Sequence, residues 1–333
     1  MGIRSTALRA LGGVVSPAGS RARLSVLIYH RVLADPDPLV PGTIDAPAFE
    51  RQMRTLAAHC HVLGLGGALR RLAAGTLPSR AVAVTFDDGY EDNVRIALPI
   101  LRRLGVPACF FVATGFLDGG MMWNDIVIES LRGARGDMLN LDVMGLGCLR
   151  IGALAERRAA LHTILSALKY LSPAERSAGT EALRRAAGAR PAIRPMMCAD
   201  DVRHLHREGM EIGGHTVTHP ILAQVSADEA RSEILEGKLR LEEILDAPVD
   251  LFAYPNGKPG RDYSSAHVRM VRELGFRAAM STRWGAASRA DDRYQLPRFT
   301  PWDRSPGRFV LRLYRNCVRR PAAGVSPGSR APA

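Results

Sequence analysis

The chain has 333 residues, 47% of them hydrophobic, which is enough to bury one large core or two ordinary ones. Its formal net charge is +12 and its pI is about 10.1, which would suit an anionic partner. The basic residues are mostly scattered arginines, and no dense basic run alternates with aromatic residues. We therefore expect no nucleic-acid partner.

The cysteines and the first residues bear on the compartment. The five cysteines lie far apart and form no Cys-x-x-Cys pair, which argues against a zinc knuckle or a disulfide framework. The His-Cys-His run at 59–61 could suggest a metal cluster, but successive side chains point in different directions, so we interpret it as a helix end or a strand. Residues 1–23 contain only short, glycine-rich apolar runs. We expect neither a signal peptide nor a membrane span, and a cytoplasmic or membrane-peripheral location.

Strand-like and helix-like segments alternate along most of the chain. We expect strands over residues 24–29, 61–65, 81–86, 108–113, 210–214, 250–254, 276–280 and 294–299. We expect helices starting at Asp45 as the N-cap and over residues 92–104, 200–208, 228–245 and 264–274. Repeated strand–helix units predict a parallel sheet, and seven or eight of them favour a closed or partly closed barrel over an open sheet.

Residues 117–197 interrupt this alternation. They contain a Trp-Asn-Asp run ending at Asp125, then a glycine-rich loop, then a charged helix-like run over 154–187. We expect a mostly helical insertion on the catalytic face of the barrel. Asp125 would either line the mouth of the barrel or serve only in packing.

The two ends of the chain set the expected domain boundaries. We expect the barrel over residues 24–320, after an N-terminal segment over 1–23, and a disordered tail over 321–333. Residues 309–320 alternate apolar residues with arginines. This segment could make a peripheral contact with an anionic membrane, or it could form a terminal helix that packs on the barrel.

Polar residues follow four of the expected strands. They are His30, the pair Asp87 and Asp88, the pair His215 and His219, and the run Tyr254, Pro255, Asn256 and Gly257. Because the carboxyl ends of barrel strands converge at one mouth, we expect these residues to lie close together. Adjacent carboxylates repel, so both stay ionised only if a cation such as a metal ion offsets them.

The residue types also suggest which metal would bind. Two neutral imidazoles and one carboxylate leave a coordination position for water, which is typical of a catalytic zinc site. Zinc is the expected ion, and cobalt or another divalent transition metal would also fit. Taken alone, an Asp-Asp-Gly run is usually a turn, and a His-x-x-x-His run is usually a surface or packed pair. The combination at strand ends is much more specific.

Three of these runs together resemble a known family. Residues 85–89 (Thr-Phe-Asp-Asp-Gly), 215–219 (His-Thr-Val-Thr-His) and 252–257 (Phe-Ala-Tyr-Pro-Asn-Gly) resemble the leading motifs of the polysaccharide deacetylases. This is the NodB-homology group, carbohydrate esterase family 4. The resemblance extends over about 24–299 outside the insertion. It implies an α/β fold, a distorted (β/α) barrel of about seven parallel strands, and metal-dependent deacetylation of an N-acetylated glycan.

The resemblance also implies roles for individual residues. Asp87 would be the catalytic base, and Asp88, His215 and His219 would bind the divalent metal. The backbone N–H of Asn256 resembles the donor to the oxyanion. The two residues before it, Tyr254 and Pro255, would shape the acetyl pocket.

Two features depart from the usual family pattern. No late Leu-x-His motif supplies the general acid, whereas Tyr29-His30-Arg31 resembles the early Tyr-His of the poly-N-acetylglucosamine deacetylase branch. His30 would then be the acid, although it could also only cap its strand. The arginine that often steadies the catalytic aspartate is also missing from the third motif. Arg298 could reach the same place, or it could lie at the surface.

Other functions stay open at this point. The same metal site could hydrolyse a small amide or a cyclic imide. A relative without activity could bind carbohydrate, although the intact set of acids and histidines argues against that. The expected substrate is an N-acetylhexosamine glycan, either an exopolysaccharide or its precursor.

Overall fold

Seven strands form one curled parallel sheet in the computed structural model, which describes residues 12–188, 193–319 and 323–326. The strands are β1 (Leu24–Tyr29), β4 (His61–Val62), β5 (Ala81–Phe86), β6 (Ala108–Val112), β9 (Glu211–Gly214), β10 (Leu251–Ala253) and β11 (Ala278–Met280). The order across the sheet is β1-β5-β6-β9-β10-β11, and the short β4 also pairs with β5. The predicted parallel α/β barrel is confirmed.

The segment at 294–299 is not a strand, contrary to the expectation. It contacts the sheet through two isolated parallel bridges, Met280 to Leu296 and Leu27 to Phe299. The proline between them has no backbone N–H, so it cannot continue a ladder of hydrogen bonds. The segment nevertheless lies between the two edge strands β1 and β11, and it closes part of the barrel.

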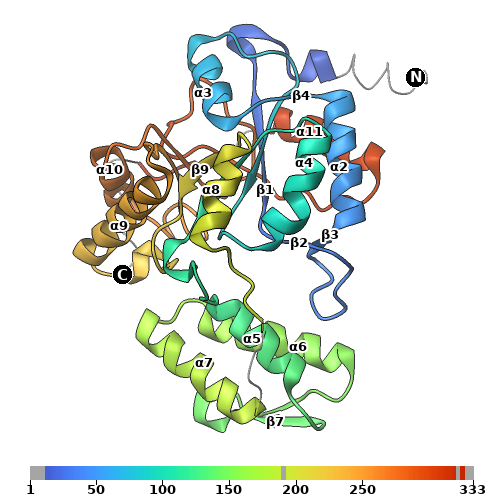
Figure 1. Ribbon diagram of the computed structural model, residues 1–333, viewed down its shortest axis with the longest axis vertical. Helices are drawn as coiled ribbons and strands as arrows, with labels where there is room; N and C mark the ends of the chain where they lie inside the picture. Colours follow the sequence, from blue (N-terminus) through green and yellow to red (C-terminus); the bar gives the residue numbers. More distant parts are fainter. Residues whose placement is uncertain (1–11, 189–192, 320–322, 327–333) are drawn as a thin grey trace.

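Helices cover the outside of the sheet (Figure 1). They are α2 (Ala46–His59), α4 (Leu98–Arg103), α8 (Ala199–Arg207), α9 (Ala227–Leu245) and α10 (Ser265–Glu273). Every residue of β1, β5 and β6 is buried, which explains why these strands are almost continuously apolar. The predicted N-cap is also confirmed, because the Asp45 side chain accepts the Ala48 N–H at 2.8 Å.

Two local expectations were wrong in detail. The strand expected over 61–65 ends at Val62, and α3 (Leu65–Ala74) begins where it was expected to finish. Two early glycines lower the helix propensity of α3, which hides its apolar spacing. The single helix expected over 92–104 instead begins with a π-helical turn, Asn93–Ala97, before α4.

The insertion forms a lobe of its own beneath the barrel in the view of Figure 1. It contains α5 (Trp123–Gly133), β7 (Met138–Asn140), β8 (Cys148–Arg150), α6 (Leu154–Leu168) and α7 (Pro173–Ala187). The glycine-rich stretch expected to be a loop includes the antiparallel pair β7 and β8. The lobe has a separate apolar core that includes Val127, Leu131, Leu161, Ile164 and Leu183.

The C-terminal helix α11 (Pro306–Val318) packs on the barrel. Phe309, Val310 and Leu313 are buried in the main core, against α2 and β1. None of the described helices is long and apolar enough to cross a bilayer. Of the expected tail, only residues 323–326 are described, and there Val325 exchanges two hydrogen bonds with Gln295. The rest of that tail and residues 1–11 lie outside the described residues.

Candidate active site

The parallel strands bring the polar motifs to one end of the barrel, as their positions in the sequence predict. His30 follows β1, the two aspartates follow β5, His215 follows β9, and Asn256 lies just after β10. All of them line a single cavity of about 270 Å³. The remaining wall of this cavity comes mainly from the insertion.

Asp88, His215 and His219 form a cluster suited to a metal ion. Oδ1 of Asp88 lies 3.4 Å from Nε2 of His215 and 3.4 Å from Nε2 of His219. This oxygen is buried and has no hydrogen-bond partner in the described residues. Within those residues, no other group of three such side chains could hold a metal. Two imidazole nitrogens and one carboxylate oxygen fit zinc or a similar divalent ion.

Other groups orient the two histidines. The Nδ1 atom of His215 lies 2.7 Å from the carbonyl oxygen of Ala253, and this contact turns Nε2 toward Asp88. The carboxylate of Glu233 accepts the N–H groups of Val217 and Thr218 at 2.9 and 2.8 Å, which holds the loop between the histidines. The sequence did not single out Glu233, because it lies in α9, well after the motif.

Several motif residues have a backbone conformation that residues other than glycine usually avoid. The φ angles are 78° for Asp88, 67° for Thr216, 55° for His219 and 58° for Asn256. Such left-handed conformations are uncommon outside glycine and cluster at functional sites, where the surrounding structure must hold them in place. Sequence patterns give no signal for them.

Asp87 is held by a buried arginine. Its two carboxylate oxygens accept hydrogen bonds from the two terminal nitrogens of Arg298 at 2.7 and 2.8 Å. Arg298 is fully buried and also donates to the carbonyl of Ser281 and the hydroxyl of Thr85. Of the two positions considered for this arginine, the structure places it at the aspartate rather than at the surface.

The electrostatics favour an ionised Asp87 and a neutral His219. Burial alone would raise the pKa of Asp87, but Arg298 and His215 bring it below its usual value. Burial lowers the pKa of His219 to about 3, so this ring is neutral, which is the form that binds metal. Burial opposes a charge on His215 as well, yet Asp88 and Asp87 raise its pKa.

Comparison with known proteins decides the family. The family model for polysaccharide deacetylase matches residues 74–134 and 162–279, more than half of the chain. The chain belongs to the polysaccharide deacetylase family. It is therefore a hydrolase of carbon–nitrogen bonds other than peptide bonds.

Individual relatives agree with this assignment. YxkH of Bacillus subtilis (strain 168), named as a polysaccharide deacetylase, is 21% identical over 279 residues, which are 83% of this chain and 71% of that protein. The deacetylase PplD of Streptococcus pyogenes, solved with acetate, has a TM-score of 0.60 and 19% identity, over 88% of this chain and 98% of its own. IcaB from Ammonifex degensii has a TM-score of 0.57 and 19% identity, over 90% of this chain and 98% of its own. These structures show the same fold.

In this deacetylase, His30 lies at the mouth of the barrel. Its side chain is exposed, lines the cavity, and makes no hydrogen bond to any other described residue. Only its carbonyl is bound, by the side-chain amide of Asn93 at 2.7 Å. The strand-capping alternative for the His30 side chain therefore finds no support in its contacts.

The third motif is placed only partly as expected. Asn256 lines the cavity, and its backbone N–H has no acceptor among the described residues. Tyr254 and Pro255 do not line the cavity. The hydroxyl of Tyr254 instead donates to the carbonyl of Tyr294, and its ring stacks on Tyr263 at 3.9 Å. The Tyr254 side chain therefore supports the loop from behind.

Asp125 faces a second cavity beside the first. This cavity has a volume of about 280 Å³. It shares His30, Asp88 and Asn124 with the cavity of about 270 Å³ that contains the Asp88, His215 and His219 cluster, which we call the metal-site cavity. The carboxylate of Asp125 is buried and accepts the hydroxyl of Tyr90 at 3.0 Å. Of the two roles considered for Asp125, its position agrees with lining the mouth.

Several lining residues were not foreseen. Met122, Leu165 and Lys169 from the insertion and Thr282 after β11 also face the metal-site cavity. The insertion was expected on this face of the barrel, but no motif marks which of its residues face the cavity, because that depends on tertiary packing.

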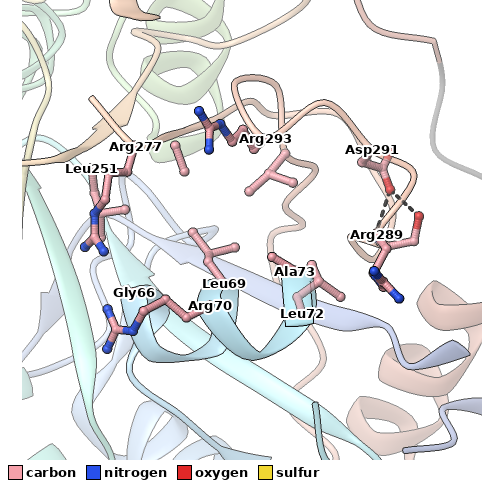
Figure 2. Close-up of a pocket in the computed structure, with 13 residues that line it drawn as sticks. Gly66, Leu69, Arg70, Leu72, Ala73, Leu251, Arg277, Arg289, Asp291 and Arg293 are labelled. Carbon is pink, nitrogen blue, oxygen red and sulfur yellow. Dashed lines mark hydrogen bonds between the residues drawn. The ribbon is translucent and has the colours of Figure 1, made fainter. Parts of the chain in front are cut away.

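A third cavity lies away from this chemistry (Figure 2). It has a volume of about 210 Å³ and lies beside α3 and the starts of β10 and β11, at the other end of the strands. Four arginines surround an apolar floor, but their guanidinium groups point in different directions in Figure 2. They do not form one anion site.

Proposed function

We propose that this protein is a metal-dependent N-deacetylase that removes acetyl groups from N-acetylhexosamine units of a polysaccharide or its precursor. The observation that carries the proposal is the cluster of Asp88, His215 and His219 beside an ionised, arginine-held Asp87. A bound metal ion and a general base together can activate water for attack on an unactivated amide.

The residues of the site have different proposed roles. Asp88, His215 and His219 would hold the ion, which when bound supplies a water of lowered pKa and polarises the amide carbonyl. Asp87 accepts the proton of the attacking water, and Arg298 keeps its carboxylate ionised and oriented.

The leaving group needs a proton, and the developing oxyanion needs a donor. The N–H of Asn256 has no other acceptor in the described residues and faces the same cavity, so it can donate to the oxyanion. His30 lines the same cavity and can give its proton to the leaving amine. Asp87 and His30 are thus the proposed base and acid.

Acetate release tests this function. Purified protein is incubated with N-acetylglucosamine oligomers, polymers and lipid-linked sugars, with and without a chelator, and bound metal is measured alongside. We expect acetate release that the chelator abolishes and that zinc or cobalt restores. A small-amide panel tests the alternative substrate class.

Matched variants separate the two aspartates. We expect Asp87→Asn to keep its metal and lose activity, and Asp88→Ala to lose both. His30→Ala should lower kcat without changing metal content. Asp246→Asn, at an exposed position outside the cavity, serves as the control. Full activity in both Asp87→Asn and Asp88→Ala would refute the proposal.

A further inference from the structure

The insertion lobe supplies part of the wall of the metal-site cavity. Leu165 lies on α6, and Lys169 follows the last residue of that helix. Trp123 and Asn124, at the start of α5, line the same cavity. The lobe that appears beneath the barrel in Figure 1 therefore lines the cavity in which the proposed substrate would bind.

Lys169 is a cation without an acidic partner at this wall. It is partly buried, and no carboxylate of the described residues lies within ion-pair distance of its ammonium group. Burial lowers its pKa, and the nearby charges of Lys258 and Arg261 act in the same direction, whereas Asp262 opposes them. Asp262 has the largest of these charge effects, and the charges of Lys258 and Arg261 also reach Lys169.

The loop that follows β10 contains the other two cations. Lys258 and Arg261 follow Asn256 closely and are both exposed. The guanidinium of Arg261 lies 3.9 Å from the centre of the Tyr170 ring, which joins this loop to the end of α6. Asn256 and Lys169 line the metal-site cavity, whereas Lys258 and Arg261 lie outside its lining, on the loop that continues from Asn256.

One acid, Asp262, lies close to these three cations. Asp262 is fully buried, and its carboxylate accepts the backbone N–H of Lys258 at 2.9 Å. Burial raises the pKa of Asp262, whereas the charges of Lys169, Lys258 and Arg261 lower it, so this single carboxylate offsets only part of their charge. The group therefore carries an excess of positive charge at the mouth.

The use of lysine at this place is unusual for the chain. The sequence contains only three lysines among 45 basic residues, and two of them, Lys169 and Lys258, are in this group. The third, Lys238, donates to Glu242 and to the carbonyl of Val249. A lysine ammonium is a compact charge with three freely rotating donors, which suits an anion approaching from a variable direction.

We infer that Lys169, Lys258 and Arg261 form an anion-recognition site at the mouth, so that the preferred glycan carries a phosphate or carboxylate group near the acetamide that is cleaved. This inference rests on the proposed function. Converging cations at a cleft raise the local concentration of anionic substrates and bind them by charge-assisted hydrogen bonds. A neutral chitin-like chain has no net charge for these cations to attract.

A direct comparison of substrates tests the inference. The wild-type protein is given a neutral N-acetylglucosamine trisaccharide, the same trisaccharide with a terminal phosphate, and one with a hexuronate in place of the terminal sugar. We expect kcat/KM to be about tenfold higher for the better anionic substrate. The ranking of the phosphate and the hexuronate identifies the source of the charge.

Variants assign the preference to the proposed site. Lys169→Gln should lose most of this preference, measured as the ratio of kcat/KM for the anionic trisaccharide to kcat/KM for the neutral one, and Lys169→Arg should retain it. Arg207→Gln, at an exposed cation at the end of α8, is the matched control. If Lys169 were instead a proton donor, Lys169→Arg would lower kcat equally on all three substrates, which would overturn the inference.

Binding separates this inference from the proposed function. Affinities of the neutral and phosphorylated trisaccharides are measured by calorimetry on Asp87→Asn, with and without Lys169→Gln. Tighter binding of the phosphorylated sugar that depends on Lys169 supports the inference even if no acetate is released. Equal affinities for both sugars would overturn it even if the enzyme is active.

Discussion

The pairing of Asp87 with Arg298 joins residues 211 positions apart in the sequence. Both side chains are buried, and the two parallel hydrogen bonds fix the plane of the carboxylate. Removing one member of a buried pair leaves an uncompensated charge, which is usually more costly than the pair itself is stabilising. Arg298 is thus a positioning residue for the proposed base.

Arg298→Gln should therefore reduce both stability and activity. We expect a loss of about 3–5 kcal/mol in the free energy of unfolding, and a fall in kcat together with a shift of the acid limb of the pH–rate profile to higher pH. Arg298→Lys should recover stability better than activity, because a single ammonium cannot make the bidentate contact. Urea unfolding and pH–rate profiles measure the two effects. An unchanged pH profile in Arg298→Gln would contradict the positioning role.

Asp125 is a second buried acid with a different environment. Burial raises its pKa to about 7, and the nearby charges of Asp88 and Glu129 add to this, whereas Arg31 and the hydroxyl of Tyr90 oppose it. The folded state therefore binds a proton that the unfolded chain releases at a pH near 4. Stability should fall as pH rises from about 4 to about 7, because ionising this carboxyl costs more in the folded protein.

Asp125→Asn should remove this part of the pH dependence. The amide oxygen can still accept the hydroxyl of Tyr90, but it cannot ionise. Between pH 5 and pH 8 we expect the variant to gain at most about 3 kcal/mol relative to the wild type. Urea unfolding at both pH values measures the difference, with Asp246→Asn as the control. A constant difference between variant and wild type would show that Asp125 is ionised throughout.

At the scale of elements, helix α9 holds the histidine loop. Glu233 on this helix binds the loop's N–H groups, and Gly237, one turn further, packs against the backbone of Thr216. A Cβ atom at Gly237 would lie 2.8 Å from the carbonyl carbon of Thr216. The left-handed conformations of Thr216 and His219 thus depend on a close approach that only glycine permits.

Gly237→Ala should disturb the proposed metal site from a distance. Alanine normally stabilises a helix, but here overpacking should cost about 1–3 kcal/mol and weaken zinc binding. Gly67→Ala in α3 is the matched control, because its Cβ would meet only the end of the Arg70 side chain at 3.9 Å. That control should gain about 0.5–1 kcal/mol. Thermal unfolding and zinc titration of both variants check the contrast, which an improved stability of Gly237→Ala would contradict.

At the scale of the whole molecule, α11 bears on the expected membrane contact. Its main apolar residues are buried against the barrel, which agrees with the packing alternative. Leu311 and Val318 remain exposed, at 51% and 63%, beside the exposed Arg308 and Arg315. Any membrane contact therefore depends mainly on charge and only weakly on apolar insertion.

Vesicle binding should accordingly be weak and sensitive to salt. We expect co-sedimentation with anionic phosphatidylglycerol vesicles at about 0.05 M salt that is lost at about 0.5 M, because screening acts within a few ångströms there. The double variant Arg308→Gln and Arg315→Gln should bind less, and Arg207→Gln should not differ from wild type. Binding to neutral phosphatidylcholine vesicles would show that apolar insertion dominates instead.

Features that depend on neighbouring residues were predictable from the sequence. Alternating apolar runs and caps such as Asp45 indicated the parallel α/β barrel, because strands, helices and their ends depend on local spacing. The position of Asp87, Asp88, His215 and His219 after strands also indicated one common site, since parallel strands end at one edge. The resemblance of the three motifs added their expected roles.

Features that depend on packing between distant segments were decided only by the tertiary structure. The sequence left Arg298 either at the surface or beside Asp87, and burial of both groups decided this. It assigned Tyr254 to the pocket, whereas stacking on Tyr263 turns that ring away. Lys169 was not considered, because only the docking of the insertion lobe brings it to the mouth. Local spacing determines which elements form and where their ends lie, and long-range packing determines which side chains meet there.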